Sequence, residues 1–390
     1  MTDRIFLDLT LSIMKQGQTA VGIIRVEREI TKALLRSGLE VGFFAYGDAD
    51  DRFHHIERSQ AAFLNDYIDP FPHYTTPSCV NGASFAPRSG DIIIAAGTLW
   101  VFNYLKHINT AKSLRTITFI AVIYDIIPLV CPEFSDPHAQ QRFQRYIADL
   151  SAITDMIYCI SDSTSRDLTR YLSQNAMRLP TLQRLVLGSD IVQKSPDCLS
   201  PLHQQLKPGA FVLCVCTLEP RKNHALLFSV WRTLYETDRE NLVPLVLVGK
   251  LGWNSKDLVN MIGQSNRLYP EYIKIFCDVA DEDLAWLYTN CLFSVYPSYY
   301  EGWGLPIAES LAYGKVCIAS DSSSMNEVGP GLAELIDPLD QLGWIQRIRQ
   351  YLRHPEYLKD RENIIKSVYT APNWHDSMQE FVASLPLDNS

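Results

Sequence analysis

Residues 296–309 read YPSYYEGWGLPIAE and decide the fold of this chain. An apolar run ends at Tyr296, a loop with Gly302 and Gly304 follows, and Pro306 suits the first turn of a helix because an N–H is not needed there. A helix that begins in this way turns its free N–H groups and its positive dipole end toward the loop, where an anion can bind. The order of strand, glycine loop and helix predicts an α/β fold with an anion site at a strand end.

The same alternation extends along most of the chain. Short apolar runs, typical of strands that are covered on both faces, alternate with segments of helical spacing. This alternation predicts an α/β protein with doubly wound, Rossmann-like parallel sheets. The expected strands are residues 5–9, 41–46, 91–96, 116–124, 156–160 and 184–187, followed by 211–216, 243–248, 273–276, 292–296 and 316–319.

A polar gap divides the strands into two groups. Residues 191–209 contain Pro196, Pro201 and Pro208, which is typical of a linker between domains. We therefore expect two domains that face each other across a cleft, with the ligand at the carboxyl ends of the strands. The expected domains are residues 1–190 and 210–372, and a last helical segment, 373–390, can cross back to the first domain.

Composition excludes several classes of protein. The 390 residues are 47% hydrophobic and 20% charged, which fits a folded protein, and the formal charge of -9 argues against a binder of duplex nucleic acid. The N-terminus does not resemble a secretory signal, and the apolar runs are too short to span a bilayer. The nine cysteines include no Cys-x-x-Cys spacing. They indicate reduced thiols in the cytoplasm, with neither a disulfide framework nor a zinc site.

A second stretch of interest, residues 217–224, reads TLEPRKNH and follows the expected strand 211–216. Arg221 has a planar guanidinium group that can donate two parallel hydrogen bonds, and Lys222 has a compact ammonium charge. Both groups suit phosphate oxygens. An Arg-Lys pair at a surface is usually a solvated turn, but this pair lies where α/β domains bind phosphate-bearing ligands. Glu309 alone could merely complement a helix dipole, yet together with Glu301 and the glycine loop it favours a binding site.

These stretches resemble a known family. Residues 219–223 and 297–309 closely resemble the nucleotide-sugar-binding half of family 4 retaining glycosyltransferases, which have the GT-B architecture, and in particular bacterial polysaccharide mannosyltransferases. The resemblance covers nearly the whole chain and is stronger in the second domain. Further matches are residues 247–253, 281–288, Glu327, 22–29, 125–128, 132–133 and 161–167.

The resemblance implies roles for individual residues. Arg221 and Lys222 would neutralise the donor diphosphate in place of a metal, and Glu301 would hold the transferred sugar as the third catalytic residue. The second domain would bind the nucleotide sugar, and the first domain the acceptor. The other implied donor-binding residues are Gly302, Gly304, Leu305, Glu309, Lys250 and Asp278, and the implied acceptor-side residues are Gly22, Arg25 and Asp125.

Three departures from the family pattern stand out. Cys216 occupies a usual glycine position, Ile24 replaces a second glycine, and Tyr124 stands where a histidine is common. The last change leaves Asp125 as the candidate that orients the acceptor.

The implied function is that of a metal-independent, retaining hexosyltransferase in polysaccharide biosynthesis. It would move mannose, the first candidate, to a lipid-linked oligosaccharide acceptor at the inner face of the plasma membrane. GDP-mannose is the favoured co-substrate and a UDP-sugar the second candidate, with no other cofactor and no nucleic-acid partner. Two alternatives stay open: a nucleotide-sugar epimerase of GT-B shape, and a non-catalytic glycosyltransferase-like binding subunit.

Three further patterns have competing interpretations. Arg25, Arg28, Lys32 and Arg36 share one face of an amphipathic helix, which is either a solvated face or a contact for an anionic diphosphate or membrane headgroups. Asp48 and Asp50 have a metal-binding spacing, with His54 and His55 close by, but we interpret them as an acidic loop. Cys214 and Cys216 share one face of a buried strand, where packing is the simplest role.

Overall fold

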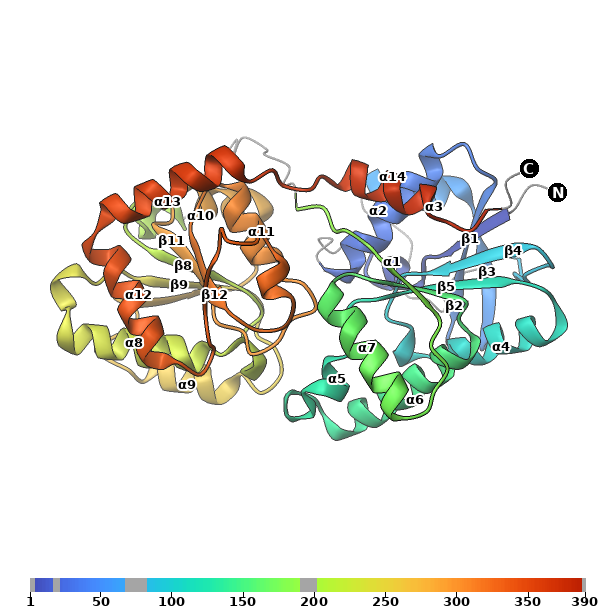
Figure 1. The fold of residues 1–390 in the computed structure, drawn as a ribbon, viewed down its shortest axis with the longest axis horizontal. Helices are drawn as coiled ribbons and strands as arrows, with labels where there is room; N and C mark the ends of the chain where they lie inside the picture. The colour runs from blue at the N-terminus through green and yellow to red at the C-terminus, as the bar shows by residue number, and fades with distance from the viewer. Residues whose placement is uncertain (1–3, 17–21, 67–82, 190–201, 388–390) are drawn as a thin grey trace. The chain divides into compact units, whose positions relative to one another are not determined.

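The computed structural model describes residues 4–16, 22–66, 83–189 and 202–387. The chain forms two compact units (Figure 1). The first unit comprises residues 1–188 together with 372–390, and the second comprises residues 189–371. Each unit is an α/β structure built on one sheet.

The first unit contains a seven-stranded sheet in the order β3-β2-β1-β4-β5-β6-β7. Neighbouring strands are parallel except β3, which pairs with β2 in the antiparallel direction. Continuous apolar runs explain the central strands, because both of their faces are covered. The strands are β1 (Arg4–Asp8), β2 (Val41–Gly47), β3 (Arg52–Ile56), β4 (Asp91–Ala95), β5 (Thr118–Ile123), β6 (Met156–Cys159) and β7 (Thr181–Arg184).

Helices cover the sheet of the first unit. Side chains of α4, α6 and α7 share one apolar core with the sheet, while α2, α3 and α14 pack together. Figure 1 shows α14, the last helix of the chain, beside α2. The ring of Phe381 in α14 packs against Tyr158 of β6, with centroids 4.8 Å apart. The helices are α1 (Thr10–Met14), α2 (Ile23–Arg36), α3 (Arg58–Asp66), α4 (Tyr104–Leu114), α5 (Ile127–Val130), α6 (Pro137–Ile153), α7 (Asp162–Gln174) and α14 (Trp374–Ala383).

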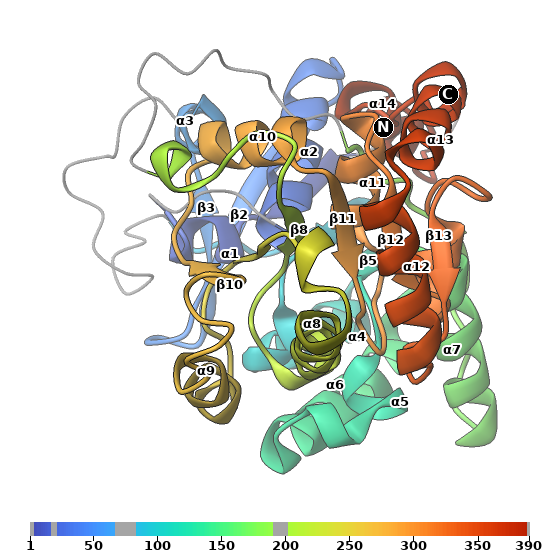
Figure 2. The ribbon, with the colours of Figure 1, turned by 90° about the vertical axis from the view of Figure 1, so that its left-hand side faces the viewer.

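The second unit contains a six-stranded, fully parallel sheet in the order β10-β9-β8-β11-β12-β13. Side chains of α8, α9, α11, α12 and α13 share one core with it, and α10 packs on a separate core cluster (Figure 2). The strands are β8 (Val212–Val215), β9 (Leu245–Val248), β10 (Ile273–Phe276), β11 (Phe293–Tyr296), β12 (Cys317–Ser320) and β13 (Glu334–Ile336). The helices are α8 (His224–Thr237), α9 (Lys256–Gly263), α10 (Asp281–Asn290), α11 (Leu305–Ala312), α12 (Gln341–Arg353) and α13 (Pro355–Val368).

The structure confirms two parallel α/β sheets and corrects some of the expected elements. Strand β7 occupies residues 181–184 instead of 184–187, and β3 and β13 were not expected. Part of the expected linker is also packed, because Leu202 and Leu206 are buried in the core cluster that includes α10. The rest of that linker, up to residue 201, lies outside the described residues. No helix in the described ranges combines the length and the apolar character needed to cross a bilayer.

Candidate active site

The loop after β8 carries the predicted cations of the second unit. Residues Pro220–Lys222 form a short 3-10 turn, and Asn223 then adopts a left-handed conformation with φ 55° before α8 begins. Asparagine tolerates this conformation better than most residues do. Gly249 at the end of β9 allows the close approach of this loop, because a Cβ atom there would lie 2.0 Å from the carbonyl oxygen of Cys216. The turn therefore has a fixed position against the sheet.

The loop after β11 carries Glu301 and is held by serines that follow β12. The backbone N–H of Glu301 donates to Ser323 Oγ at 2.8 Å, and Ser324 Oγ donates to the carbonyl oxygens of Glu301 and Trp303. Gly304 has φ 130°, a conformation that strongly favours glycine, and α11 begins at the next residue. This geometry matches the strand, glycine loop and helix that the sequence predicts.

Arg221, Lys222 and Glu301 form one buried ion-pair cluster, which we call the RKE cluster. Lys222 Nζ donates to Glu301 Oε1 at 2.6 Å and to the Tyr296 hydroxyl at 3.0 Å. The Arg221 guanidinium lies 2.9 Å from Glu301 Oε2 and donates to Glu219 Oε1 at 2.7 Å. Glu301 is only 7% exposed and Lys222 only 9%. The structure thus brings together the three predicted catalytic residues.

The charges of the RKE cluster control its protonation. Burial alone would raise the pKa of Glu301, but the charges of Lys222 and Arg221 outweigh it and hold that pKa at about 2. Burial would lower the pKa of Arg221, and the negative charges of Glu301 and Glu219 raise it instead. Glu301 and Arg221 are therefore both charged at neutral pH.

The other predicted donor-binding residues are distributed along the same edge of the sheet. Lys250 and Asp278 are exposed and follow β9 and β10, while Gly302, Gly304 and Leu305 belong to the loop and first turn of α11. Because the strands are parallel, their carboxyl ends meet at one edge, where α/β sheets bind ligands. Glu309 in α11 is half-buried and accepts a hydrogen bond from the Tyr288 hydroxyl at 2.8 Å.

Known proteins resemble this unit and the whole fold. Residues 203–370 match the family described as glycosyl transferases group 1. The match is confined to the second unit of this chain. Sucrose-phosphate synthase from Thermosynechococcus elongatus has the same GT-B fold, with a TM-score of 0.67 and 17% identity over 98% of each chain. Anabaena HepE in complex with UDP-glucose gives a TM-score of 0.65 at 14% identity, covering 98% of this chain and 100% of that one.

Curated relatives are mannosyltransferases. O-antigen chain mannosyltransferase B of Escherichia coli is 30% identical over 57% of this chain and 58% of its own length. The serotype-specific mannosyltransferase WbdA of the same species is 26% identical over 79% of this chain and 36% of its own length. The chain thus spans little more than half of the first relative and about a third of the second.

The implied acceptor-side residues belong to the first unit. Gly22 precedes α2 with φ 55° and is exposed. Arg25 places its guanidinium over the Trp374 ring, 5.2 Å from the centroid. Asp125 follows β5, and one of its oxygens accepts from the backbone N–H of Ile127 at 2.9 Å. Their roles toward an acceptor stay predictions.

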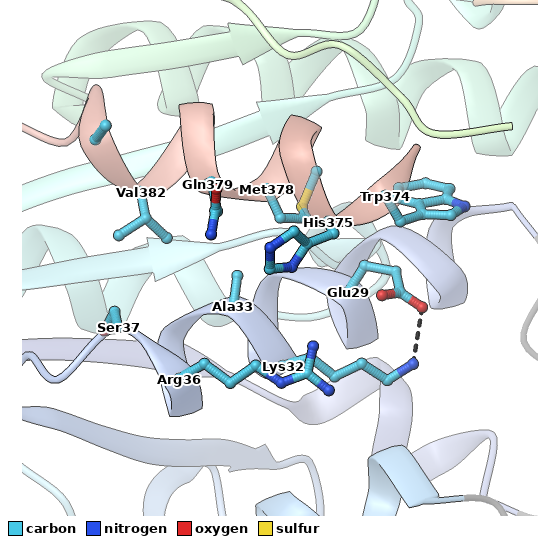
Figure 3. Close-up of a pocket in the computed structure, with 11 residues that line it drawn as sticks. Glu29, Lys32, Ala33, Arg36, Ser37, Trp374, His375, Met378, Gln379 and Val382 are labelled. Carbon is cyan, nitrogen blue, oxygen red and sulfur yellow. Dashed lines mark hydrogen bonds and ion pairs between the residues drawn. The ribbon is translucent and has the colours of Figure 1, made fainter. Parts of the chain in front are cut away.

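The expected basic stripe of α2 needs correction. Arg28 is buried, so it does not belong to a solvated face. Lys32 Nζ is bonded to Glu29 at 2.8 Å, and Lys32 and Arg36 border a groove of about 220 Å³ between α2 and α14 (Figure 3). From α14 the groove is lined partly by apolar side chains, among them Met378 and Val382, and from α2 by Lys32 and Arg36 together with Glu29, the partner of Lys32. Its lining residues are Glu29, Lys32, Ala33, Arg36, Ser37, Trp374, His375, Met378, Gln379, Val382 and Ala383.

The acidic loop after β2 serves local structure. Asp50 pairs with Arg52 and with His54, whose Nε2 lies 2.9 Å from it. Asp51 accepts a hydrogen bond from the Tyr46 hydroxyl at 2.6 Å and contacts His107 at 2.8 Å. These contacts fit the interpretation of an acidic loop.

A buried carboxyl pair, Asp8 and Glu27, was missed in the sequence. Both side chains are 0% exposed, and Glu27 Oε1 accepts from the backbone N–H of Ser12 at 2.7 Å. Their other oxygens have no hydrogen-bond partner among the described residues and face Gly97, whose absent side chain leaves the space for them. Burial raises the pKa of Asp8 to about 7, and burial together with the Asp8 charge raises that of Glu27 to about 8. The only available signal was Asp8, which interrupts the apolar run of β1.

Removing Lys222 should destabilise the second unit. Lys222→Ala leaves buried Glu301 with one cation instead of two, and breaking a buried pair costs about 3–5 kcal/mol in free energy of unfolding. The double variant Lys222→Met/Glu301→Gln should lose less free energy of unfolding than Lys222→Met and Glu301→Gln lose in sum. In the double variant both members of the pair lose their charge, so neither is left buried without its partner. Scanning calorimetry of the full chain measures the unfolding transitions.

Arg267→Ala is the control, since it removes an exposed cation of the same unit and should change the stability by no more than about 0.5 kcal/mol. Strictly additive effects of the two single variants would show that Lys222 and Glu301 are not coupled.

Rising pH should destabilise the first unit through Asp8 and Glu27. Their pKa values are higher in the folded than in the unfolded state, so between about pH 5 and pH 8 the folded state holds protons that the unfolded state has released. The free energy of unfolding must therefore fall as the pH rises from about 5 to about 8. Asp8→Asn or Glu27→Gln should flatten the dependence and raise the unfolding temperature at pH 8.

The measurement is the unfolding temperature at several pH values, with Glu380→Gln, an exposed carboxylate on α14, as the control. If Asp8→Asn and Glu27→Gln both keep the pH dependence of the unsubstituted chain, the pair does not retain its protons.

Proposed function

We propose that this protein is a retaining, metal-independent hexosyltransferase. It transfers mannose from a nucleotide-diphosphate sugar, with GDP-mannose as the first donor to test and a UDP-sugar as the second, to a lipid-linked oligosaccharide. The mannosyltransferase relatives support the sugar, and the neighbour that binds UDP-glucose supports a nucleotide-sugar donor. The RKE cluster is the observation that carries the proposal.

The chemistry of transfer explains why such a cluster is useful. Breaking the bond between sugar and diphosphate places additional negative charge on the leaving group, and fixed positive groups stabilise that charge. Lys222 Nζ has three protons and uses two of them on Glu301 and Tyr296, so a third can reach a phosphate oxygen. Glu301 keeps both cations in position before the donor arrives, which removes a cost of reorganisation during the reaction.

The loop and helix beside the RKE cluster supply the remaining donor contacts. The backbone N–H groups of Gly302, Gly304 and Leu305 lie at the start of α11, where the helix dipole favours an anion. Glu309 would bind the ribose hydroxyls, and Lys250 and Asp278 would line the nucleotide. No step of this proposal uses a divalent metal, because Arg221 and Lys222 supply the positive charge.

The first unit would bind the acceptor and contact an anionic membrane surface at the cytoplasmic side. Gly22, Arg25 and Asp125 would form the acceptor side. The groove between α2 and α14 supports the membrane contact. Its apolar lining residues suit an acyl chain, and Lys32 and Arg36 on its α2 side suit a lipid phosphate.

A nucleotide panel tests the donor assignment. Thermal shifts with GDP, UDP and ADP and with their sugar conjugates should identify one base, because a ligand at 100 times its Kd adds about 2.7 kcal/mol to the free energy of unfolding. Transfer to a lipid-linked acceptor should then fall by about 10²–10³ in Lys222→Met, which loses one stabilising group. Arg267→Ala should transfer at the normal rate.

The outcomes separate the proposed function from its alternatives. A donor that is converted to a sugar stereoisomer without any acceptor would identify an epimerase. Nucleotide binding without any turnover would identify a binding subunit. Normal transfer by folded Lys222→Met would refute the role of the RKE cluster.

Binding to vesicles tests the membrane contact. The double variant Lys32→Glu/Arg36→Glu should bind phosphatidylglycerol vesicles at least about tenfold more weakly, since each basic residue near an anionic surface contributes about 1 kcal/mol. Lys106→Glu/Arg115→Glu is the matched control, because it makes the same charge change at exposed positions in and just after α4. Equal losses in both double variants would show that only net charge matters, and the groove would then have no specific role.

A further inference from the structure

A cluster of soft ligands lies in the second unit, in the core next to the RKE cluster. Cys214 belongs to β8, Cys216 follows it on the same face, and His224 begins α8. The three side chains are 0%, 9% and 2% exposed. Their ligand atoms all lie within 4.8 Å of one another. The loop that carries Arg221 and Lys222 connects the two ends of this cluster.

We propose that Cys214, Cys216 and His224 bind a single zinc-class ion in tetrahedral geometry. Zinc bonds of about 2.3 Å to sulfur and about 2.0–2.1 Å to nitrogen give tetrahedral edges of about 3.8 Å between two sulfurs and about 3.5 Å between sulfur and nitrogen. The observed distances are 3.8 Å between the two Sγ atoms and 3.4 Å between Cys216 Sγ and His224 Nε2. Two of the three distances between ligand atoms therefore already match tetrahedral coordination, and the third, between Cys214 and His224, is within 4.8 Å.

The chemistry of the three ligand atoms determines which kind of metal ion can bind. Two thiolates and an imidazole suit zinc and other thiophilic metals, whereas magnesium and calcium require oxygen ligands. Three protein ligands leave a fourth position for water or another small ligand. This inference replaces the sequence-based interpretation of the two cysteines as packing alone, and it holds whether or not the proposed transferase activity is correct.

The environment of His224 disfavours a charged ion pair with Cys216 and is compatible with coordination. Nδ1 of His224 is buried and has no hydrogen-bond partner among the described residues. In a thiolate–imidazolium pair, the unpaired N–H would belong to a charged ring, which is very costly in a buried position. A neutral ring, whether hydrogen-bonded to the Cys216 thiol or bound to a metal, leaves the same atom unpaired at a much lower cost. A bound ion would also tie the end of β8 to the start of α8 and so close the loop that carries Arg221 and Lys222.

Cobalt provides the direct test. The full chain, prepared without metal under reducing conditions, is titrated with Co²⁺, which takes the place of zinc and is visible by absorption. We expect one equivalent to produce a thiolate-to-cobalt charge-transfer band and the d–d bands of tetrahedral cobalt, both abolished by added Zn²⁺. Zn²⁺ should also raise the unfolding temperature. A chain that shows no such bands would overturn the proposal, and this measurement needs no variant.

Variants locate the site. Cys214→Ser/Cys216→Ser should lose the bands and the stabilisation by Zn²⁺, while circular dichroism checks that the variant is folded. Cys291→Ser is the matched control, because Cys291 is equally buried in the same unit but belongs to another core cluster. Bands that persist in the double cysteine variant would assign the metal to other thiols, such as exposed Cys277, and would also overturn the proposal.

Discussion

One buried carboxylate, Glu301, holds the candidate site together. Its two oxygens compensate Lys222 and Arg221, and neither cation could be buried at this position without a partner. The same contact joins two loops, because the backbone N–H of Tyr299 donates to the carbonyl oxygen of Arg221 and the Arg221 guanidinium donates to that of Tyr300. These contacts fix the loops after β8 and β11 against each other, in addition to the contacts that each loop makes with the sheet and with the serines after β12.

The sequence predicts the central strands and the edge strand β10 well, and the other three edge strands poorly. Central strands are covered on both faces, so their apolar runs are a direct signal. Strand β7, with the sequence TLQR, and β3, with RFHHI, lack such a run, and pairing with a neighbouring strand is what makes them extended. β13 has only three residues, which is too short for an alternation of apolar and polar residues to be recognised. The missed elements are thus those whose structure depends on tertiary contacts.

For the candidate site, residue types were predictable and their pairings were not. Spacing at strand ends placed Arg221, Lys222 and Glu301 at the same edge, yet the bond between Lys222 and Glu301 spans 79 positions and leaves no local pattern. In the same way, helical spacing places the basic residues of α2 on one face, but it cannot show that Arg28 is buried or that α14, from the other end of the chain, packs beside that helix. Long-range partners decide which charges are buried.

The two units bury carboxyl groups by opposite means. Glu301 is balanced by cations, which lower its pKa, so its contribution to stability is present above its unfolded pKa and is lost as pH falls toward about 2. Asp8 and Glu27 retain protons instead, so their burial becomes costly as pH rises toward about 7 and 8. Through these groups, acid weakens the second unit and alkali weakens the first. Between about pH 2 and pH 7, protonated Asp8 and Glu27 and ionised Glu301 therefore coexist in one chain.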